Sequence, residues 1–345
     1  MARRREKHRP SDAIGRSHRL NARDVHAGSR FRRRTVARPG LESIYDHPGR
    51  VRSKYIVAGG HRTHYLESGD PAARPVVLVH GANFEFGMGV DRWYPTILPL
   101  SKAFRVIAVD ELGGGGTDPP ARLDDIGDVR VRADHVLAFI QAVGISPAHL
   151  IGQSQGGWIA AYVALTRPDL VDRLILVDSA SLALPAGGMG GSNIAARFSD
   201  DFHPGTMIRK VLQPTRESLR AAVSSMVFDQ SMLCDDFIGR LVPLALKWMP
   251  IWKEPWARFW ADGGRRNRDQ YLINGVHISE LIHLLRSPPL IIWGKNSVKG
   301  IENGVSLYQR IPDAQLHVFD KANHFVWLDQ WRDFNSLATW YLAKS

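Results

Sequence analysis

Cysteine is almost absent from this sequence. Cys234 is the only one among 345 residues, which excludes a disulfide within the chain. Extracellular proteins often contain several cysteines, because disulfides persist in oxidising compartments. The apolar run of a signal peptide is missing as well, and so is any window long and apolar enough to span a bilayer. We therefore expect a soluble protein of the reducing cytoplasm, with no membrane span.

Acidic residues are scarce at the start of the chain. Residues 1–40 hold 13 lysines and arginines but three acidic residues, and so supply +10 of the formal net charge of +11. Because apolar periodicity is also lacking there, the composition indicates a disordered basic leader over residues 1–45. The rest of the chain holds 32 basic and 31 acidic residues. Binding to nucleic acid or anionic lipid would thus depend on the leader alone, and we do not expect nucleic acid as a partner.

Buried strands and amphipathic helices alternate along the chain after residue 55. Two short alternating segments, Tyr55–Val57 and Thr63–Glu67, are separated by Gly59-Gly60 and predict a hairpin. Runs rich in Val, Ile and Leu predict buried parallel strands at Pro75–Val79, Phe104–Val109, Ala148–Ile151 and Leu174–Val177. Helices are predicted between them, for example at 129–143 and 156–167. The alternation indicates an α/β fold, with a mostly parallel twisted sheet and helices on both faces.

The pattern changes between residues 181 and 286. This stretch is helical and aromatic-rich without a strand-like run, and Leu290–Trp293 and Leu316–Phe319 then resume the sheet. Such an insertion predicts a helical cap at 181–286 between two parts of the core, 46–180 and 287–345.

Four tryptophans recur every fourth residue within this cap, at Trp248, Trp252, Trp256 and Trp260. An apolar substrate tunnel or a membrane-facing stripe would both need one continuous helix. Pro250 and Pro255 should break such a helix, so we interpret the tryptophans as cap packing.

Ser154 is the candidate nucleophile, in the pentapeptide Gly152-Gln153-Ser154-Gln155-Gly156. The pentapeptide directly follows the apolar strand that ends at Ile151 and precedes the helical run Trp158–Leu165, which is the strand-turn-helix context of a nucleophile elbow. Glycines are needed because the serine adopts a strained backbone conformation in a sharp turn. A structural turn without a catalytic role is the alternative.

A histidine and two backbone amides would complete the chemistry. His324 follows the last apolar strand, where a fold with a nucleophile elbow carries its general base, and a surface histidine is the alternative. An oxyanion needs hydrogen-bond donors, and strand Val76–Val79 runs into His80-Gly81-Ala82-Asn83. The backbone N–H groups of Ala82 and Gln155 are the predicted oxyanion hole.

These motifs carry a resemblance to a known family. The elbow and His80-Gly81 are similar to those of the α/β-hydrolase superfamily, and the resemblance runs from about residue 55 onward. Within the superfamily the chain resembles the meta-cleavage product hydrolases, which cleave a carbon–carbon bond in ring-fission dienoates. The narrower similarity lies in Leu219–Arg240, with Phe228-Asp229-Gln230-Ser231, and in Leu316-His317-Val318-Phe319 followed by His324 and Phe334-Asn335.

The resemblance implies an α/β-hydrolase fold with a cap that selects the substrate. In the family an arginine of the cap binds the substrate carboxylate, and the matching position here is Arg240. A salt bridge from this arginine to a carboxylate of the cap is the alternative. Asn83 and Phe325 are the other expected substrate contacts.

Three positions depart from the family pattern. A Gly- and Pro-rich loop is replaced by Ala82-Asn83-Phe84-Glu85, and Gln153 stands where the family has asparagine. Ser297 occupies the place of the catalytic aspartate, whose loss can lower turnover on the order of 10⁴-fold. Asp178 is our first candidate for the acid, because some superfamily members hold it at the end of that strand. Glu302 is the second candidate, and a strand-end turn role for Asp178 is the alternative.

We therefore expect a serine hydrolase that acts without a cofactor on a small, carboxylated or carbonyl-bearing apolar compound. His61 and His64 have no third ligand nearby, so no metal is expected. A homo-oligomer stays open. Two other functions also stay open: an esterase or lactone hydrolase of secondary metabolism with the same residues, and a non-hydrolytic, ligand-binding protein that kept the fold but lost the acid.

Overall fold

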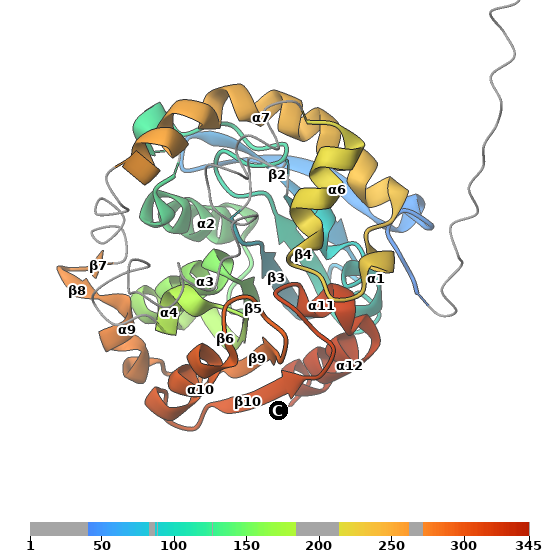
Figure 1. The fold of residues 1–345 in the computed structure, drawn as a ribbon. Coiled ribbons are helices and arrows are strands. Elements are labelled where there is room, and N and C mark those ends of the chain that lie inside the picture. The colour runs from blue at the N-terminus through green and yellow to red at the C-terminus, as the bar shows by residue number, and fades with distance from the viewer. Residues whose placement is uncertain are drawn as a thin grey trace, which may run out of the picture. The chain divides into compact units, whose positions relative to one another are not determined.

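The structure, a computed structural model, describes residues 41–82, 87, 89–125, 127–183, 214–261 and 272–344. Side chains are described for all of these residues except 124 and 255–261. Eight strands form one sheet in the order β1-β2-β4-β3-β5-β6-β9-β10 (Figure 1). The strands are β1 (Arg52–Ala58), β2 (His61–Ser68), β3 (Pro75–Val79), β4 (Arg105–Val109), β5 (Ala148–Gln153), β6 (Val171–Val177), β9 (Leu290–Gly294) and β10 (Gln315–Phe319). β1 and β2 form the predicted hairpin, β2 pairs antiparallel with β4, and all other neighbours in this sheet are parallel. The predicted mostly parallel sheet is confirmed.

Helices cover both faces of the sheet, because successive side chains of a strand point to opposite faces. In β3, Val76 and Leu78 belong to one buried cluster and Val77 and Val79 to the other. One face is covered by α2 (Val129–Val143), α3 (Gln155–Thr166) and α10 (Ile301–Arg310), and the other by α1 (Ile97–Leu100), α11 (Val326–Asp329) and α12 (Trp331–Leu342). In Figure 1 the first group lies to the left of the strands and the second to the right.

Short 3₁₀ helices join these elements: η1 (Pro48–Arg50), η3 (Val90–Trp93), η4 (Leu123–Asp125), η5 (Pro168–Leu170), η9 (Gln230–Met232) and η10 (Ile282–Leu284). The ends of α2 follow from local sequence. The Asp128 side chain accepts hydrogen bonds from the backbone N–H groups of Arg130 and Val131, and Gly144 ends the helix with φ 68°. Helix 129–143 is therefore found where it was predicted.

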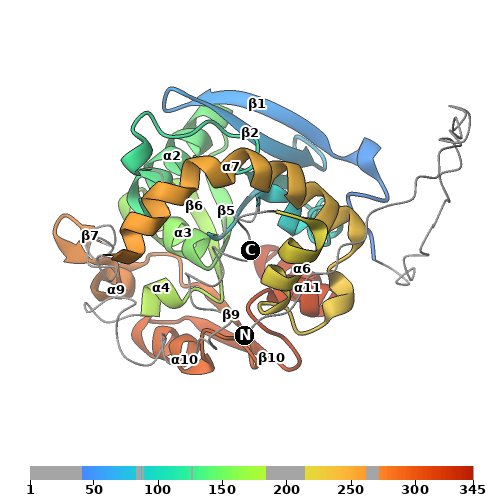
Figure 2. The same cartoon turned by 45° about the horizontal axis from the view of Figure 1, so that its top comes forward.

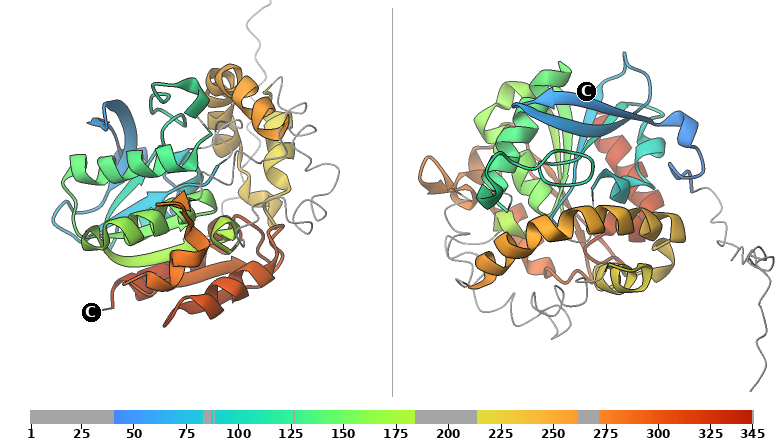
Figure 3. Two further views of the ribbon diagram at one scale, coloured as in Figure 1. Left: turned by 90° about the vertical axis from the view of Figure 1, so that its left-hand side faces the viewer. Right: turned by 90° about the horizontal axis from the view of Figure 1, so that it is seen from above.

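The inserted region contains α4 (Ala180–Ala183), α6 (Arg216–Ser224), α7 (Asp235–Ala261), and α9 (Ile278–Leu281). Figures 2 and 3 show α6 and α7 side by side beyond one end of the strands. Two short strands, β7 (Leu272–Ile273) and β8 (Val276–His277), also pair here. The prediction of a region without strands was therefore wrong, because Asn274 and Gly275, both with positive φ, make a tight turn there.

Helix α7 also corrects the prediction that Pro250 and Pro255 break the helix. Its 27 residues run through both prolines. Tertiary contacts outweigh the local cost of proline, since Trp248 Nε1 donates to Gly115 O at 2.9 Å and Trp252 Nε1 donates to Gly113 O at 3.1 Å. Trp248 and Trp252 also pack against Ala82, so α7 lies over the carboxyl ends of β3 and β4. The side chains of the other two tryptophans lie outside the described residues.

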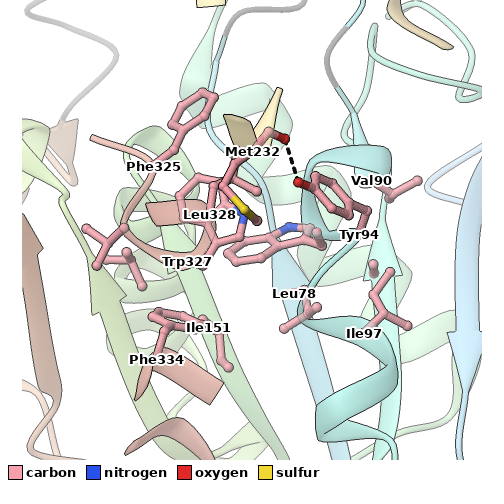
Figure 4. Close-up of a cluster of buried hydrophobic side chains, with 14 of the residues drawn as sticks. Leu78, Val90, Tyr94, Ile97, Ile151, Met232, Phe325, Trp327, Leu328 and Phe334 are labelled. Atoms are coloured by element: carbon pink, nitrogen blue, oxygen red, sulfur yellow. Dashed lines mark hydrogen bonds between the residues drawn. The ribbon is translucent and has the colours of Figure 1, made fainter. Parts of the chain in front are cut away.

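The inserted region shares a hydrophobic core with the sheet (Figure 4). Met232 packs with Trp327 and Tyr94 in this core, and Tyr94 Oη donates to Met232 O at 2.6 Å.

The predicted end of the leader at residue 45 differs from the structure. Ile44 is buried in the same core, and the ring of Tyr45 stacks on that of Tyr94 with centroids 5.3 Å apart. Within the described ranges, none of the helices has the length and hydrophobicity needed to cross a membrane.

Candidate active site

The backbone at Ser154 has the strain expected of a nucleophile elbow. Ser154 joins β5 to α3 with φ 54° and ψ −122°, and its N–H donates to Val177 O at 2.9 Å. A Cβ at Gly156 would lie 2.4 Å from the carbonyl oxygens of Val79 and His80, and one at Gly152 would lie 2.3 Å from Gly156 O. Only glycine fits at either position, so the turn brings β5 and α3 against the loop after β3.

Asp178 and His324 lie side by side at the ends of their strands. Asp178 follows β6 and His324 lies between β10 and α11, and His324 Nδ1 is 2.7 Å from Asp178 Oδ1. Both side chains are buried. The carboxylate also accepts from Ser297 Oγ at 2.8 Å and from Gly294 N at 3.2 Å. Three donors thus converge on Asp178, a setting that suits an anionic carboxylate.

The other nitrogen of His324 contacts Gln153. His324 Nε2 lies 3.0 Å from Gln153 Nε2, while Gln153 Oε1 accepts from Arg92 Nη1 at 3.1 Å. A guanidinium can only donate, so the arginine fixes which end of the amide carries oxygen. The amide nitrogen therefore donates to His324 Nε2, and His324 Nδ1–H donates to Asp178. This tautomer is the one that a general base next to a carboxylate requires.

Burial lowers the pKa of His324 below its ordinary value. Asp178 opposes the shift, whereas the positive charges of Lys299 and Arg92 add to it. Burial also lowers the pKa of Lys299 to about 8, and Asp178 again opposes that change. A neutral imidazole with a carboxylate on Nδ1 is therefore the form of His324 at neutral pH.

The predicted oxyanion loop is held by buried polar groups. Arg92 Nη2 donates to Ala82 O at 2.7 Å. His80 Nδ1 donates to Gly81 O at 2.8 Å, and His80 Nε2 accepts from Glu111 N at 3.1 Å. Burial lowers the pKa of His80 to about 3, so this ring is neutral and structural. The hydrogen bonds from Arg92 and His80 therefore fix the carbonyl groups of Ala82 and Gly81, which flank the Ala82 N–H.

Gln155, the other predicted oxyanion donor, is the first residue of α3. Its amide lies directly after the Ser154 turn, at the N-terminal end of the helix. Arg132 anchors its side chain by donating to Gln155 Oε1, and Arg132 Nη1 donates to Glu111 Oε2 at 2.8 Å. Burial raises the pKa of Glu111 to about 7, against the lowering effect of Arg132 and Arg92.

The structure places the remaining predicted residues in different settings. Arg240 is 57% exposed, pairs with Asp91 at 3.7 Å and covers the ring of Tyr45, so it does not join the buried group around His324. This is the salt bridge that was the alternative for this residue, although its carboxylate partner comes from the core. Phe325 is fully buried beside His324, with ring centroids 5.7 Å apart.

The last two predicted residues are Asn83 and Glu302. Asn83 lies outside the described residues. Glu302, the second candidate for the acid, lies on α10, and the hydrogen bond of His324 Nδ1 goes to Asp178.

Arg92 was not predicted at this site. It is fully buried in η3 and contacts both Ala82, 10 residues before it, and Gln153, 61 residues after it. No local motif marks it among 45 lysines and arginines. An arginine after a short apolar segment is too common a pattern to indicate a buried position.

A hydrogen-bonded Ser–His–Asp chain links the β1–β2 hairpin to Asp110, which follows β4. Ser53 Oγ is 2.8 Å from His64 Nε2, and His64 Nδ1 is 2.6 Å from Asp110 Oδ2. Asp110 also accepts from Gly116 N, so this chain ties the glycine-rich loop at 113–116 to the hairpin. Ser53 lies within the regular strand β1, whereas Ser154 lies at a strained turn. The two serines therefore differ in backbone conformation. In the described part of the chain no group of three or more His, Cys, Asp or Glu residues could hold a metal ion.

The fold agrees with comparisons to known proteins. The sequence profile of the α/β hydrolase fold matches residues 74–330, and the chain therefore belongs to the α/β-hydrolase fold family.

Similar proteins include several hydrolases with named substrates. The chain is 28% identical over 295 residues to 2-hydroxymuconate semialdehyde hydrolase of Pseudomonas sp. (strain CF600), covering 84% of this chain and 93% of that protein. It is 27% identical over 286 residues to 2-hydroxy-6-oxo-6-phenylhexa-2,4-dienoate hydrolase of Comamonas testosteroni, with coverage of 81% and 91%. Among solved structures, the meta-cleavage product hydrolase of Pseudomonas fluorescens IP01 superposes with a TM-score of 0.65 at 27% identity, covering 84% of this chain and 97% of that one.

Proposed function

We propose that the protein is a serine hydrolase of the meta-cleavage product type, with Ser154 as nucleophile, His324 as base and Asp178 as acid. The observation that supports this most is the 2.7 Å contact between His324 Nδ1 and Asp178, next to the strained elbow at Ser154. In this proposal Ser297 stands where the family has its acid, and Asp178 at the end of β6 takes over that role. Ser297 supports it by a hydrogen bond to the same carboxylate oxygen.

The proposed reaction begins when His324 Nε2 takes the proton of Ser154 Oγ, or of a water, as oxygen attacks the substrate carbonyl. The backbone amides of Ala82 and Gln155 would stabilise the oxyanion, and Asp178 would stabilise the imidazolium. The carbonyl then re-forms, the carbon–carbon or carbon–oxygen bond breaks with its electron pair on the leaving group, and His324 returns the proton to that group. Where Ser154 is the nucleophile, water then attacks the acyl-enzyme with His324 as base, and Ser154 Oγ leaves with the proton.

The substrate class is the finer part of the proposal. The named relatives act on 2-hydroxy-6-oxo dienoates and similar compounds, which carry both a carboxylate and a ketone or aldehyde. Burial of His324 and of His80, which directly follows β3, supports a compact apolar substrate. We therefore expect a small compound with a carbonyl and an acidic group.

The test measures turnover of a panel of 2-hydroxy-6-oxo dienoates and p-nitrophenyl esters, together with labelling by a fluorophosphonate. Wild type should turn over at least one dienoate and become labelled, while Ser154→Ala should lose both. Ser53→Ala is the matched control, because it removes the serine of the other Ser–His–Asp chain and should keep turnover and labelling.

Three outcomes would separate the alternatives. Turnover of esters alone would mean an esterase with the same machinery. No turnover and no labelling would mean that the fold binds ligands without hydrolysing them. Label that persists in Ser154→Ala but disappears in Ser53→Ala would move the nucleophile to the hairpin and overturn the proposal.

A further inference from the structure

We infer that Ser179 is a positioning residue for the oxyanion hole, because its buried hydroxyl holds the peptide group that carries the Gln155 N–H in the direction that the reaction needs. The inference rests on the proposed function and deepens it. Ser179 directly follows Asp178, the proposed acid, and has no part in the mechanism above.

The hydroxyl of Ser179 contacts the peptide group between the nucleophile and the oxyanion donor. Ser179 is fully buried, and its Oγ donates to Ser154 O at 2.6 Å. Because the peptide group is planar and trans, Ser154 C=O and Gln155 N–H point in opposite directions from one rigid unit. A donor that fixes the carbonyl oxygen therefore also fixes the direction of the Gln155 N–H.

Ser179 ties this peptide group to the sheet. Ser154 O also accepts from the backbone N–H groups of Gly157 at 3.0 Å and Trp158 at 3.4 Å. Both of those donors belong to α3 and move with it, whereas Ser179 follows β6. The N–H of Ser154 donates to Val177 O at 2.9 Å, at the end of the same strand. The end of β6 therefore holds the nucleophile on both sides, independently of the helix.

The elbow leaves space for this hydroxyl at Gly157. A Cβ at Gly157 would lie 2.6 Å from Ser179 Oγ and 2.7 Å from Ser179 Cβ. A side chain at this position would displace the serine from its place against the peptide. The glycine thus allows α3 to begin in direct contact with the Ser179 side chain.

The other predicted oxyanion donor has a similar arrangement. His80 Nδ1 donates to Gly81 O at 2.8 Å, and this carbonyl shares a peptide group with the Ala82 N–H. A Cβ at Gly81 would lie 2.8 Å from Ser154 Cβ, so this peptide lies against the nucleophile. For both donors, therefore, a buried side chain holds the carbonyl of the peptide whose N–H would serve the oxyanion.

Asp178 and Ser179 give the end of β6 two roles. Asp178 N donates to Ile292 O at 2.9 Å, which fixes this turn to β9. The Asp178 carboxylate then contacts His324, and the Ser179 hydroxyl contacts Ser154 O. Two adjacent residues thus orient the base and one donor of the oxyanion hole.

The experiment compares Ser179→Ala with Ser181→Ala by kcat and KM on the best substrate of the panel. Ser181 is the matched control, because it is a buried serine two residues further on whose hydroxyl has no hydrogen-bond partner among the described residues. Ser179→Ala should lower kcat about tenfold or more and change KM less than about threefold, because the hole acts on the transition state. Ser181→Ala should leave both constants near their wild-type values.

A trifluoromethyl ketone, trifluoroacetophenone, gives a second measurement of the hole. Ser154 Oγ forms a bond to its carbonyl carbon, the carbonyl electron pair moves onto the ketone oxygen, and His324 takes the hydroxyl proton. The alkoxide that results occupies the oxyanion hole, so the inhibition constant should rise in Ser179→Ala by about the factor by which kcat falls. A serine needed only for packing would lower the midpoint of thermal unfolding and leave this constant unchanged.

Any of three results would overturn the inference. Ser179→Ala could behave as Ser181→Ala does, its loss could lie in KM, or kcat could fall while the inhibition constant stays the same. If Ser179→Ala fails to fold, Ser179→Cys decides the matter, because a thiol has a similar shape but is a weak donor. Ser179→Cys should show the same joint change in kcat and inhibition constant, and wild-type values would contradict the inference.

The inference and the proposed function fail in different ways. A wild type that turns over a substrate and is labelled at Ser154, with a Ser179→Ala variant that matches Ser181→Ala, overturns the inference alone. A wild type with no turnover of dienoates or esters and no fluorophosphonate label overturns the proposed function, and the inference with it.

Discussion

Ser297 Oγ and His324 Nδ1 approach the same oxygen of Asp178, at 2.8 Å and 2.7 Å. A hydroxyl donor on a carboxylate spreads its charge and fixes its plane, so the oxygen that faces the imidazole cannot rotate away. The serine therefore has a defined place in the site, although it cannot orient a histidine by itself.

Asp178→Asn should lower kcat on the order of 10³- to 10⁴-fold, because the amide favours the wrong histidine tautomer and cannot stabilise the imidazolium. Glu302→Gln should lower it far less, since the described hydrogen bond of His324 Nδ1 goes to Asp178. Steady-state kinetics on the best substrate of the panel measure both. Equal, small losses in the two variants would mean that His324 works without a carboxylate.

Moving the carboxylate back to position 297 should rescue the loss in part. Ser297→Asp alone would put two carboxylates side by side, and their repulsion should reduce activity. In Asp178→Asn/Ser297→Asp one carboxylate remains, close to the oxygen that His324 uses, and kcat should exceed that of Asp178→Asn by about tenfold. A double variant no better than Asp178→Asn would show that position 297 no longer reaches the imidazole.

Much of the sheet could be predicted because a short run of apolar residues in the sequence indicates a buried strand. Pro75–Val79 was predicted to the residue, since its apolar run ends in a clear change of composition. The elbow was equally local, because strand, glycines and helix are contiguous in the sequence. Such features need no knowledge of which segments meet in space.

The network around the base could not be predicted, because its members come from separate parts of the chain. Arg92 on η3 meets Gln153 at the end of β5, and Gln153 meets His324 from beyond β10. The prediction that Pro250 and Pro255 break helix α7 was wrong for a similar reason. Proline has a local cost, whereas the tryptophan contacts that keep the helix intact involve the distant glycine-rich loop.

Gly156→Ala should remove activity and destabilise the fold by about 3 kcal/mol, because the added Cβ would meet two backbone oxygens that cannot move independently. Those oxygens lie 2.4 Å from the Cβ position. Gly49→Ala is the matched control, since nothing lies within 4 Å of its Cβ position. Thermal or urea unfolding measures both, and equal stabilities of the two variants would contradict the close packing at the elbow.

The pH dependence of kcat/KM should report the burial of His324. The base works only when neutral, so activity should rise with pH through a midpoint below 6.5, the ordinary value for histidine. The charge of Lys299 lowers the pKa of His324, and Lys299 itself, with a pKa of about 8, is still protonated at that midpoint. Lys299→Met should therefore move the midpoint to higher pH. Asp178 raises the same pKa, so Asp178→Asn should move the midpoint to lower pH in the activity that remains. A midpoint above 6.5 in wild type, or shifts of the opposite sign in the two variants, would mean that a group other than His324 limits the rate.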